Sequence, residues 1–356
     1  MTNEKFGELI KDKRILVTGG TGSIGRIIVK NLLKYQPRVI RILSRDTTKQ
    51  IALQEELADS INIRYILGDI RDSERILMAC EDIDIIFHAA AFKYVPQGEY
   101  NPFETVQTNV IGTQNLITAA LKTPSVSRFI MISTDKAVQP SSTMGASKLL
   151  AERLVCAAQY VQGSKSKVFT TVRFGNVLGT AGSVVPFFIK RIRQGDPLVV
   201  THPDMTRFFM TINDAVQLVF AAVVHAQGGE IFVLKMPAVA IKDLAEVCVE
   251  RYGDKPVPVT YGAIRAGENI TEALLNPAEI PNALETDTHF IIAPSVNVPG
   301  FPAYHYPGAR PLQSQAYHSD TVRRLSKEEI AALLNRAEIP FPSVGTASVS
   351  ASYSQP

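Results

Sequence analysis

A short segment near the middle of the chain carries three side chains that can bind or exchange protons. Thr134, Asp135 and Lys136 stand side by side after an apolar run, and Lys148 follows in a segment with helical spacing. A hydroxyl, a carboxyl and an amine can together remove one proton and donate another. Met144 lies one helical turn before Lys148 and has no proton to exchange. These residues predict a site that joins acid–base chemistry to hydride transfer by a nicotinamide cofactor.

A glycine-rich turn near the start of the chain predicts where that cofactor binds. It follows an apolar run and precedes a helical pattern, so its glycines let the backbone turn tightly and approach a pyrophosphate at the helix N-terminus. A glycine triplet also marks ordinary turns, and the position between strand and helix favours the cofactor site. The predicted loop consists of Gly19, Thr21, Gly22, Ser23, Ile24 and Gly25.

The residues after the second and third apolar runs indicate which dinucleotide is bound. Ser44 and Arg45 end the second run, and an arginine fork suits a 2′-phosphate, which favours NADP. The alternative is a solvated Arg45, with Asp46 bound to the ribose. Asp69 and Ile70 follow the third run, where Asp69 either contacts the adenine or serves as a turn carboxylate.

Small side chains end the fourth apolar run. Ala89, Ala90 and Ala91 leave room for the nicotinamide ribose. The preceding His88 is interpreted as a hydrogen-bonded core residue, with a catalytic role as the alternative.

Apolar runs and helical patterns alternate through the first half of the chain. The predicted strands are 14–18, 39–44, 63–67, 83–88, 128–133 and 168–173. The predicted helices between them are 23–35, 48–59, 72–79, 103–121 and 144–162. This alternation predicts an α/β fold with a Rossmann-type, doubly wound parallel sheet.

From residue 174 onward, glycine and proline become frequent and the strands less regular. We expect a cofactor domain over 1–173, and over 174–339 a smaller C-terminal substrate-binding lobe whose chain returns to the first domain. Residues 241–251, 273–275 and 326–335 have helical patterns. The composition of 340–356 predicts a disordered tail.

The composition excludes several classes of protein. The 356 residues are 46% hydrophobic and 20% charged, with a net charge of +3, so no nucleic-acid surface is expected. No apolar run is long enough to cross a membrane, and the polar start is not a signal peptide, so we expect a cytoplasmic protein. Cys80, Cys156 and Cys248 lack metal-ligand spacing, and no metal site is predicted.

With these motifs the chain resembles an extended short-chain dehydrogenase/reductase, and more narrowly the UDP-N-acetylglucosamine 4,6-dehydratases of surface-glycan pathways. The resemblance covers about residues 10–335, and the segments 133–137 and 205–208 are its most specific parts. The other matching segments are 18–25, 44–46, 88–96, 99–102, 173–179, 182–188 and 228–233.

The resemblance implies a reaction without net redox change. A hydride leaves C4 of the sugar, a base removes the C5 proton, water leaves C6, and the hydride returns to C6. By resemblance Lys136 is the C5 base and Asp135 the C6 acid. A lysine base must be neutral, so its pKa would have to be lowered by burial near the cofactor's positive charge. The alternative is a surface ion pair between these two side chains.

The resemblance also assigns the helix that follows. Lys148 would hold the nicotinamide ribose, and Met144 replaces the tyrosine that most relatives use as the C4 base. Thr134, a water or Lys148 would then transfer the C4 proton, and Met144 would be either a site residue or ordinary helix packing. Asn109 would brace the active-site lysine through water or backbone.

Other family positions would meet the sugar nucleotide. Ala266 and Asn269 replace a proline and a lysine that the family usually carries, which leaves the uridine side less defined. The predicted substrate residues are Lys93, Asn109, Asn176, Arg207, Arg265 and Glu268.

Two competing readings remain. A 4-epimerase or ketoreductase would act on the same nucleotide sugar, although epimerases seldom place acid and base side by side here. A non-catalytic NADP-binding regulatory protein would explain Met144. In each reading the partner is a UDP-sugar or the cofactor, and we expect a homo-oligomer.

Overall fold

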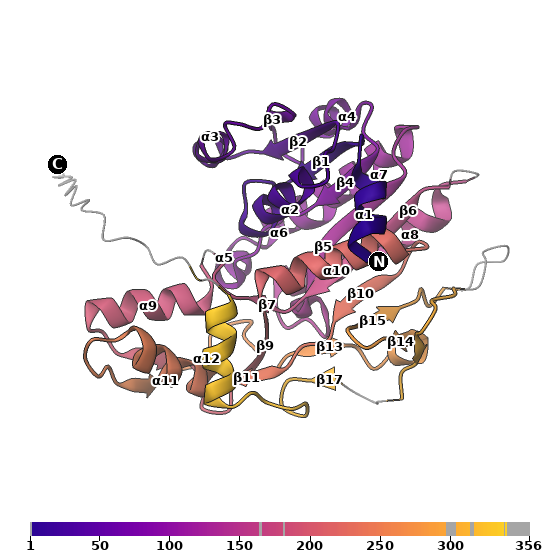
Figure 1. The fold of residues 1–356 in the computed structure, drawn as a ribbon. Coiled ribbons are helices and arrows are strands. Elements are labelled where there is room, and N and C mark those ends of the chain that lie inside the picture. Colours follow the sequence, from indigo (N-terminus) through magenta and orange to yellow (C-terminus); the bar gives the residue numbers. More distant parts are fainter. Residues whose placement is uncertain are drawn as a thin grey trace.

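A ten-stranded sheet forms the centre of the molecule (Figure 1), with strand order β16-β14-β15-β10-β6-β5-β4-β1-β2-β3. The computed structural model describes residues 2–163, 166–180, 182–296, 304–313, 317–337 and 339. The tail predicted over 340–356 lies outside these residues. The parallel strands are β1 (Arg14–Thr18), β2 (Val39–Ser44), β3 (Ile63–Leu67), β4 (Ile85–His88), β5 (Arg128–Thr134), β6 (Val168–Phe174) and β10 (Ile231–Leu234).

The parallel part has the order of a doubly wound sheet, in which the chain starts at β1, moves to β3 and then crosses to β4. The predicted Rossmann-type α/β fold is confirmed. Three antiparallel strands extend the sheet beyond β10, so residues from the second half of the chain complete it. They are β14 (Ala283–Glu285), β15 (His289–Ile292) and β16 (Arg310–Pro311).

Helices cover both faces of the sheet. Alternate side chains of β1 enter different cores, since Ile15 and Val17 pack in one apolar cluster and Leu16 in the other. The first cluster lies under α1 (Thr2–Ile10), α2 (Ser23–Leu33), α3 (Thr47–Glu56) and α10 (Ile212–His225). The second lies under α4 (Ser73–Cys80), α7 (Gly112–Lys122) and α8 (Thr143–Val161).

The helix predicted over 103–121 is interrupted. It consists of α6 (Pro102–Val106), a π-helical turn at Gln107–Ile111, and α7, while the short α5 (Val95–Tyr100) precedes it. Asn109 lies in the π-helical turn, where its side chain exchanges hydrogen bonds with the backbone of Phe92. At Gly112 a Cβ would lie 2.6 Å from Ile70, so the glycine permits a close approach.

The remaining residues form a second layer around a separate apolar core (Figure 1). Its small sheets pair β7 (Asn176–Val177) and β11 (Ala238–Ala240) with β9 (Thr206–Met210), and β8 (Leu198–Val200) with β12 (Val259–Tyr261). Its helices are α9 (Val184–Gln194), α11 (Ile241–Tyr252) and α12 (Lys327–Arg336).

One predicted helix in this half is wrong. Residues 273–275 form strand β13 (Ala273–Leu275), which pairs with β17 (Tyr317–His318). All three β13 side chains are buried. A short apolar run does not distinguish a buried strand from a buried helix by its pattern, and pairing with a distant strand decided the outcome here.

Candidate functional site

The glycine-rich loop between β1 and α2 brings backbone close to the end of β4. Gly19 has a φ of +67°, and a Cβ on it would lie 2.6 Å from the backbone nitrogen of Ala90. A Cβ on Gly25 would lie 2.3 Å from the carbonyl oxygen of Gly19. Gly22 caps α2 without a side-chain hydrogen bond. The loop therefore fits a pyrophosphate approaching the start of a helix, in a space that side chains would fill.

The residues predicted to select the cofactor's ribose phosphate lie together at the ends of β1 and β2. The Thr21 and Ser44 hydroxyls are 2.8 Å apart. Asp46 caps α3, because its carboxylate accepts from the backbone nitrogen of Lys49 at 3.0 Å and pairs with the Lys49 ammonium at 2.6 Å. The Asp46 carboxylate is therefore already bound within the protein, while the Arg45 side chain is 54% exposed to solvent.

Asp69, predicted either to contact the adenine or to serve as a turn carboxylate, accepts a hydrogen bond from the Arg71 backbone nitrogen at 3.0 Å, as a turn carboxylate would. Its carboxylate pairs with Arg71 at 2.6 Å and with Arg45 at 3.6 Å. Burial raises the pKa of Asp69, but the hydrogen bonds from Arg71 outweigh it and the pKa lies below its usual value. Ile70 is buried against Gly112 at the start of α7, so its side chain belongs to the core.

The end of β4 lies against the glycine loop, as the small residues there require. Ala89 donates its N–H to the carbonyl of Thr18 at 3.0 Å, and Ala90 and Ala91 continue past the loop. The His88 ring is buried between the hydroxyls of Thr18 and Thr113, at 2.8 and 3.0 Å. Burial lowers the pKa of His88 to about 3, so the ring is neutral, which suits a hydrogen-bonded residue of the core.

The predicted acid and base lie in a 3₁₀ turn, Asp135–Ala137, directly after β5. The Asp135 carboxylate is completely buried and its Oδ1 accepts from Lys136 Nζ and from the Thr134 hydroxyl, each at 2.9 Å. The Lys136 side chain retains 25% of its exposure. The surface ion pair considered above is therefore excluded, because one partner is buried inside the protein.

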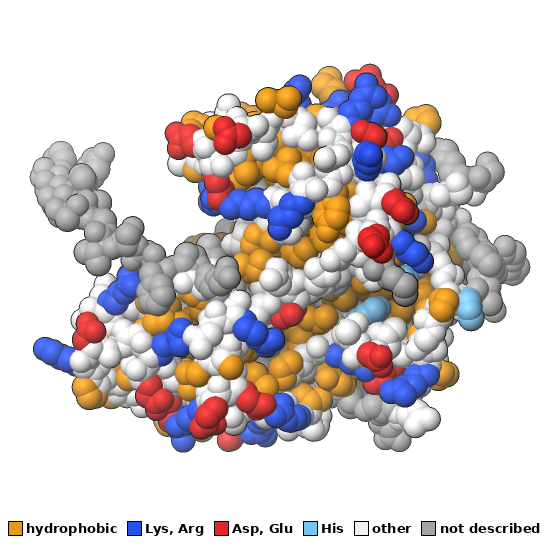
Figure 2. All heavy atoms as spheres, in the orientation of Figure 1, with side chains coloured by type: hydrophobic (Ala, Val, Ile, Leu, Met, Phe, Trp, Pro, Cys, Tyr) orange, Lys and Arg blue, Asp and Glu red, His pale blue; other side chains and the backbone are white. Residues whose placement is uncertain are grey.

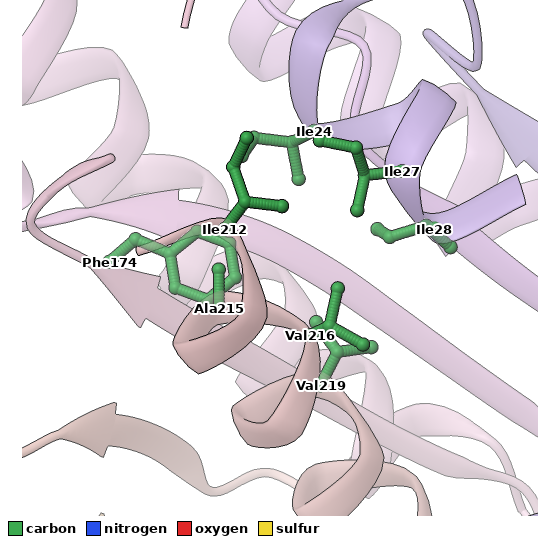
Figure 3. A pocket seen from close by; sticks show the side chains of 8 residues that line it. All are labelled: Ile24, Ile27, Ile28, Phe174, Ile212, Ala215, Val216 and Val219. Atoms are coloured by element: carbon green, nitrogen blue, oxygen red, sulfur yellow. The ribbon is translucent and has the colours of Figure 1, made fainter. Parts of the chain in front are cut away.

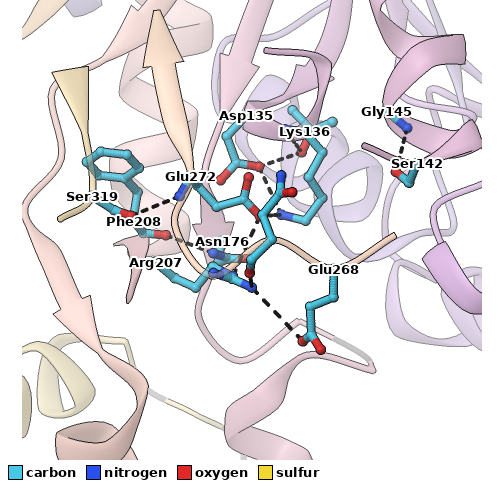
Figure 4. Close-up of polar contacts among 12 residues, drawn as sticks. Asp135, Lys136, Ser142, Gly145, Asn176, Arg207, Phe208, Glu268, Glu272 and Ser319 are labelled. Carbon is cyan, nitrogen blue, oxygen red and sulfur yellow. Dashed lines mark hydrogen bonds and ion pairs between the residues drawn. The ribbon is translucent and has the colours of Figure 1, made fainter. Parts of the chain in front are cut away.

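Glu272, which the sequence analysis missed, completes this group (Figure 4). It precedes β13, is 3% exposed, and its Oε1 lies 3.6 Å from both Lys136 Nζ and Arg207 Nε. Burial raises the pKa of Glu272, with opposition from the positive charge of Lys136. A charged residue directly before a buried apolar run was the available signal, but nothing in one sequence connects it to residue 136.

The neighbours of Lys136 favour its charged form, whereas the role of a base requires the neutral amine. Burial opposes the ammonium, but Asp135 and Glu272 outweigh it and raise the pKa of Lys136 above its ordinary value. Lys136 therefore rests as an ammonium held by two carboxylates. Asp135 Oδ2 and Glu272 Oε2 are buried without a hydrogen-bond partner among the described residues.

Arg207, predicted to meet the sugar nucleotide, lies beside this group, and most of its donors are already engaged. Its Nη1 donates to the carbonyls of Thr206 and Ile270 at 2.8 and 2.9 Å, and its Nη2 donates to the carbonyl of Asn269. The guanidinium also lies 4.0 Å from Glu268. Arg207 thus clamps the segment that carries Glu268 and Glu272 onto β9.

The other predicted substrate residues are more dispersed. Asn176 donates to the carbonyl of Phe208 at 3.1 Å, close to Arg207 (Figure 4). Arg265 is exposed, and its backbone nitrogen donates to Glu268. Lys93 lies over the Tyr94 ring, and burial together with Lys49 lowers its pKa.

Asn109 supports helix α8 and does not face a substrate, which corrects its predicted place among the substrate residues. Its amide is buried and bonds Phe92 on both sides, and its Nδ2 donates to Ser147 at 2.9 Å. Ser147 in turn donates to the carbonyl of Met144. The predicted bracing of the lysine is therefore exerted on the first turns of α8.

Met144 and Lys148 share one face of α8, and both are buried. Lys148 donates to the carbonyl of Ile132 on β5 at 2.6 Å. Burial, opposed by Glu152, lowers the pKa of Lys148 to about 8. A substantial fraction of this amine is therefore neutral at slightly alkaline pH.

Two cavities contrast in character. One of about 300 Å³ opens beside the turn that follows Lys136, between Val138, Gln139 and the segment from Asn269 to Ala273. The other, of about 10 Å³, lies between α2 and α10, and its lining is apolar (Figure 3). A volume that small holds at most one water, so the second cavity is a packing defect.

The molecular face in Figure 2 is hollowed between the part that holds α3 and the part that holds α9. In the described ranges, no three or more His, Cys, Asp or Glu side chains are grouped to hold a metal ion. No described helix combines the length and apolar character needed to cross a bilayer.

Known proteins resemble this chain over most of its length. An uncharacterized membrane protein of Methanocaldococcus jannaschii is 49% identical over 93% of this chain and 98% of its own. A UDP-N-acetylglucosamine 4,6-dehydratase (inverting) of Campylobacter jejuni is 40% identical, over 82% of this chain and 85% of its own. A UDP-glucose 4-epimerase of Rickettsia canadensis is 35% identical, over 91% and 95%.

Among solved structures, Pen from Bacillus thuringiensis has a TM-score of 0.88 and 41% identity, and the match covers 93% of this chain and 99% of that one. The predicted resemblance to UDP-N-acetylglucosamine 4,6-dehydratases is confirmed by these matches. The family described as polysaccharide biosynthesis protein matches residues 15–294, and the chain belongs to this family.

Proposed function

We propose that this protein is a nicotinamide-dependent 4,6-dehydratase of UDP-N-acetylglucosamine that yields a 4-keto-6-deoxy sugar nucleotide for glycan synthesis. The observation that carries the proposal is the buried group of Asp135, Lys136 and Glu272 directly after β5. β5 ends at the same edge of the sheet as the glycine loop after β1, because the two strands are parallel to β4 between them. Relatives named as dehydratases at 40% identity support the assignment.

Asp135 and Lys136 divide the proton transfers. The cofactor, when bound, accepts a hydride from C4 and returns it to C6. Lys136 first passes its resting proton to the Asp135 carboxylate along their 2.9 Å hydrogen bond, and the neutral amine then takes the proton from C5. The protonated Asp135 donates its proton to the C6 hydroxyl, which leaves as water.

The C4 hydroxyl needs another proton acceptor, because Met144 has none to offer. Lys148 has a pKa lowered to about 8, which supports a role for its neutral form. The Thr134 hydroxyl is the other candidate, since it can pass a proton along its 2.9 Å hydrogen bond to Asp135.

The cofactor proposal is NADP in preference to NAD. Asp46, the acid that would bind a ribose hydroxyl, is occupied by capping α3 and by Lys49. Ser44, Thr21 and Arg45 offer hydroxyls and a cation suited to a 2′-phosphate. Titration of the protein with NADP and NAD tests this choice. We expect at least about tenfold tighter binding of NADP, and Arg45→Ala should abolish the difference.

One experiment separates the possible reactions. The purified protein is incubated with UDP-N-acetylglucosamine in heavy water and the sugar is followed by NMR. A dehydratase produces a C6 methyl and incorporates deuterium at C5. A sugar that remains unchanged despite tight NADP binding would contradict the proposal and favour a regulatory protein.

A 4-epimerase is the second candidate, because relatives named UDP-glucose 4-epimerase match 91% of the chain. An epimerase would invert C4 and form no methyl. The adjacent Asp135 and Lys136 favour the dehydratase, since epimerization requires no proton exchange at C5 or C6.

A further inference from the structure

Glu272 provides a second carboxylate for Lys136 from a different part of the fold. Its Oε1 lies 3.6 Å from Lys136 Nζ, and its other oxygen is buried without a hydrogen-bond partner in the described chain. A buried carboxylate is costly unless cations and hydrogen bonds compensate it. Because one oxygen of the buried Glu272 carboxylate has no such compensation among the described residues, the carboxylate is a poor source of stability, which indicates a functional role.

The backbone around Glu272 is held from two sides (Figure 4). The fully buried Ser319 accepts from the Glu272 nitrogen at 2.9 Å, and its own nitrogen donates to the Glu272 carbonyl at 2.9 Å. Arg207 binds the carbonyls of Asn269 and Ile270 just before it. These contacts fix the carboxylate at its distance from Lys136.

We propose that Glu272 is a positioning residue that aims the Lys136 amine and sets how readily this amine loses its proton. The inference rests on the proposed function only in taking the C5 proton as the target of Lys136. The ion pair itself belongs to the protein without substrate. Glu272 thus controls when Lys136 is an ammonium and when it is a base.

The charges around Lys136 determine the sign of the effect. Asp135 comes from the same turn, Glu272 from the start of β13, and Arg207 from β9 behind Glu272. Helix α8 adds no charge to the amine, because Lys148 turns its ammonium to the carbonyl of Ile132. Removing the Glu272 charge takes away an anion 3.6 Å from the Lys136 amine and leaves only Glu268, at 4.0 Å, to balance Arg207, so the pKa of Lys136 must fall.

The test measures the reactivity of Lys136 in the full-length protein without sugar or added cofactor. Trace acetylation by acetic anhydride reacts only with neutral amines, and peptide mass spectrometry reports the rate at each lysine. An opposite charge at this distance shifts a pKa by about one unit or more. At a fixed pH below the pKa, Glu272→Gln should therefore acetylate Lys136 about tenfold faster than wild type, relative to the exposed Lys190.

Two further variants control this result. Glu285→Gln removes a carboxylate that pairs with Lys235, and it should leave the Lys136 rate unchanged. Glu272→Asp retains the charge on a shorter side chain and should give a rate between wild type and Glu272→Gln. It also serves as the test if Glu272→Gln does not fold by circular dichroism. A Lys136 rate within about twofold of wild type in Glu272→Gln, or in Glu272→Asp if the former is unfolded, would overturn the proposal.

The same variants distinguish this inference from the proposed function. If wild type forms no C6 methyl, the dehydratase proposal fails while the acetylation result still decides the role of Glu272. If wild type is a dehydratase, C5 exchange rises with pH as Lys136 loses its proton. Glu272→Gln should then move this rise to lower pH by about one unit, whereas a merely structural change would lower the rate at every pH.

Discussion

Two groups of charged side chains lie at neighbouring strands of the same sheet, and each places one cation between two carboxylates. At β6, Arg173 is completely buried and donates to both oxygens of Glu152 and both oxygens of Glu279, at 2.7 to 3.1 Å. It also donates to the carbonyl of Leu274 at 2.9 Å. All three nitrogens of the Arg173 guanidinium therefore donate hydrogen bonds within the protein.

The group at β5 is incomplete by comparison. Lys136 is partly exposed, and Asp135 and Glu272 each keep one buried oxygen without a partner in the described residues. A fully satisfied network fixes structure, whereas an unsatisfied one beside open space can take up or release a proton. The difference is what an anchor in the first group and the proposed reactive site in the second would require.

Loss of the Lys136 amine should have the largest effect on activity. Lys136→Ala removes the proposed C5 base, and a general base contributes about a hundredfold to ten-thousandfold to the rate. We expect methyl formation, followed by NMR, to fall by about a thousandfold while NADP binding remains. Lys190→Ala, at an exposed position of α9, should behave as wild type. Turnover retained by Lys136→Ala would exclude this lysine as the base.

Loss of the anchoring cation should instead affect stability. Arg173→Met leaves two buried carboxylates without their cation, and the free energy of unfolding should fall by about 3–5 kcal/mol in urea denaturation. The control Arg310→Ala removes an exposed arginine near Glu285 and should change stability by less than about 0.5 kcal/mol. Equal stabilities of the two variants would remove the distinction between anchor and surface pair.

Ser319→Ala should have an intermediate effect, on stability and on the group at Lys136. It removes the acceptor of the Glu272 N–H, and an orphaned buried donor costs about 1–3 kcal/mol of stability. The carboxylate of Glu272 remains, so acetylation of Lys136 should rise less than in Glu272→Gln. Unchanged stability together with unchanged acetylation would show that Ser319 does not hold Glu272.

The smallest expected effect is a pH dependence of stability at Lys148. Its pKa is lowered to about 8 in the fold, below the ordinary lysine value, so the unfolded chain binds more protons between these two values. Stability therefore rises as pH increases through this interval. Relative to Lys148→Met, the wild-type free energy of unfolding should increase by about 1 kcal/mol per pH unit just above pH 8. A constant difference between the two proteins would contradict the lowered pKa.

The sequence predicts the central sheet well because its strands are short β-branched runs that need no distant information. The site is predicted where its members are neighbours in the chain, as Asp135 and Lys136 are. Glu272 could not be predicted as a member of the site, because its contact with Lys136 depends on the pairing of β13 with β17. The same pairing turned a predicted helix into β13.

Residue type alone does not show what surrounds Arg207 and Lys136. Three backbone carbonyls accept hydrogen bonds from the Arg207 guanidinium, and two of them belong to Asn269 and Ile270. Lys136 pairs with Asp135, its neighbour in the chain, and also with Glu272. The contacts from the segment 268–272 could not be predicted, because no local pattern specifies where this segment lies.

The π-helical turn at Gln107–Ile111 sets the direction in which the side chains of α7 point. One surplus residue in a helix rotates everything after it by about 100° about the helix axis. This rotation lets Asn109 reach toward α8 while Leu116 and Ile117 still face the sheet. Deleting one residue there would turn one of two sets of side chains away from its partner. Either Asn109 would lose its contact with Ser147, or the apolar stripe of α7 would no longer face the sheet.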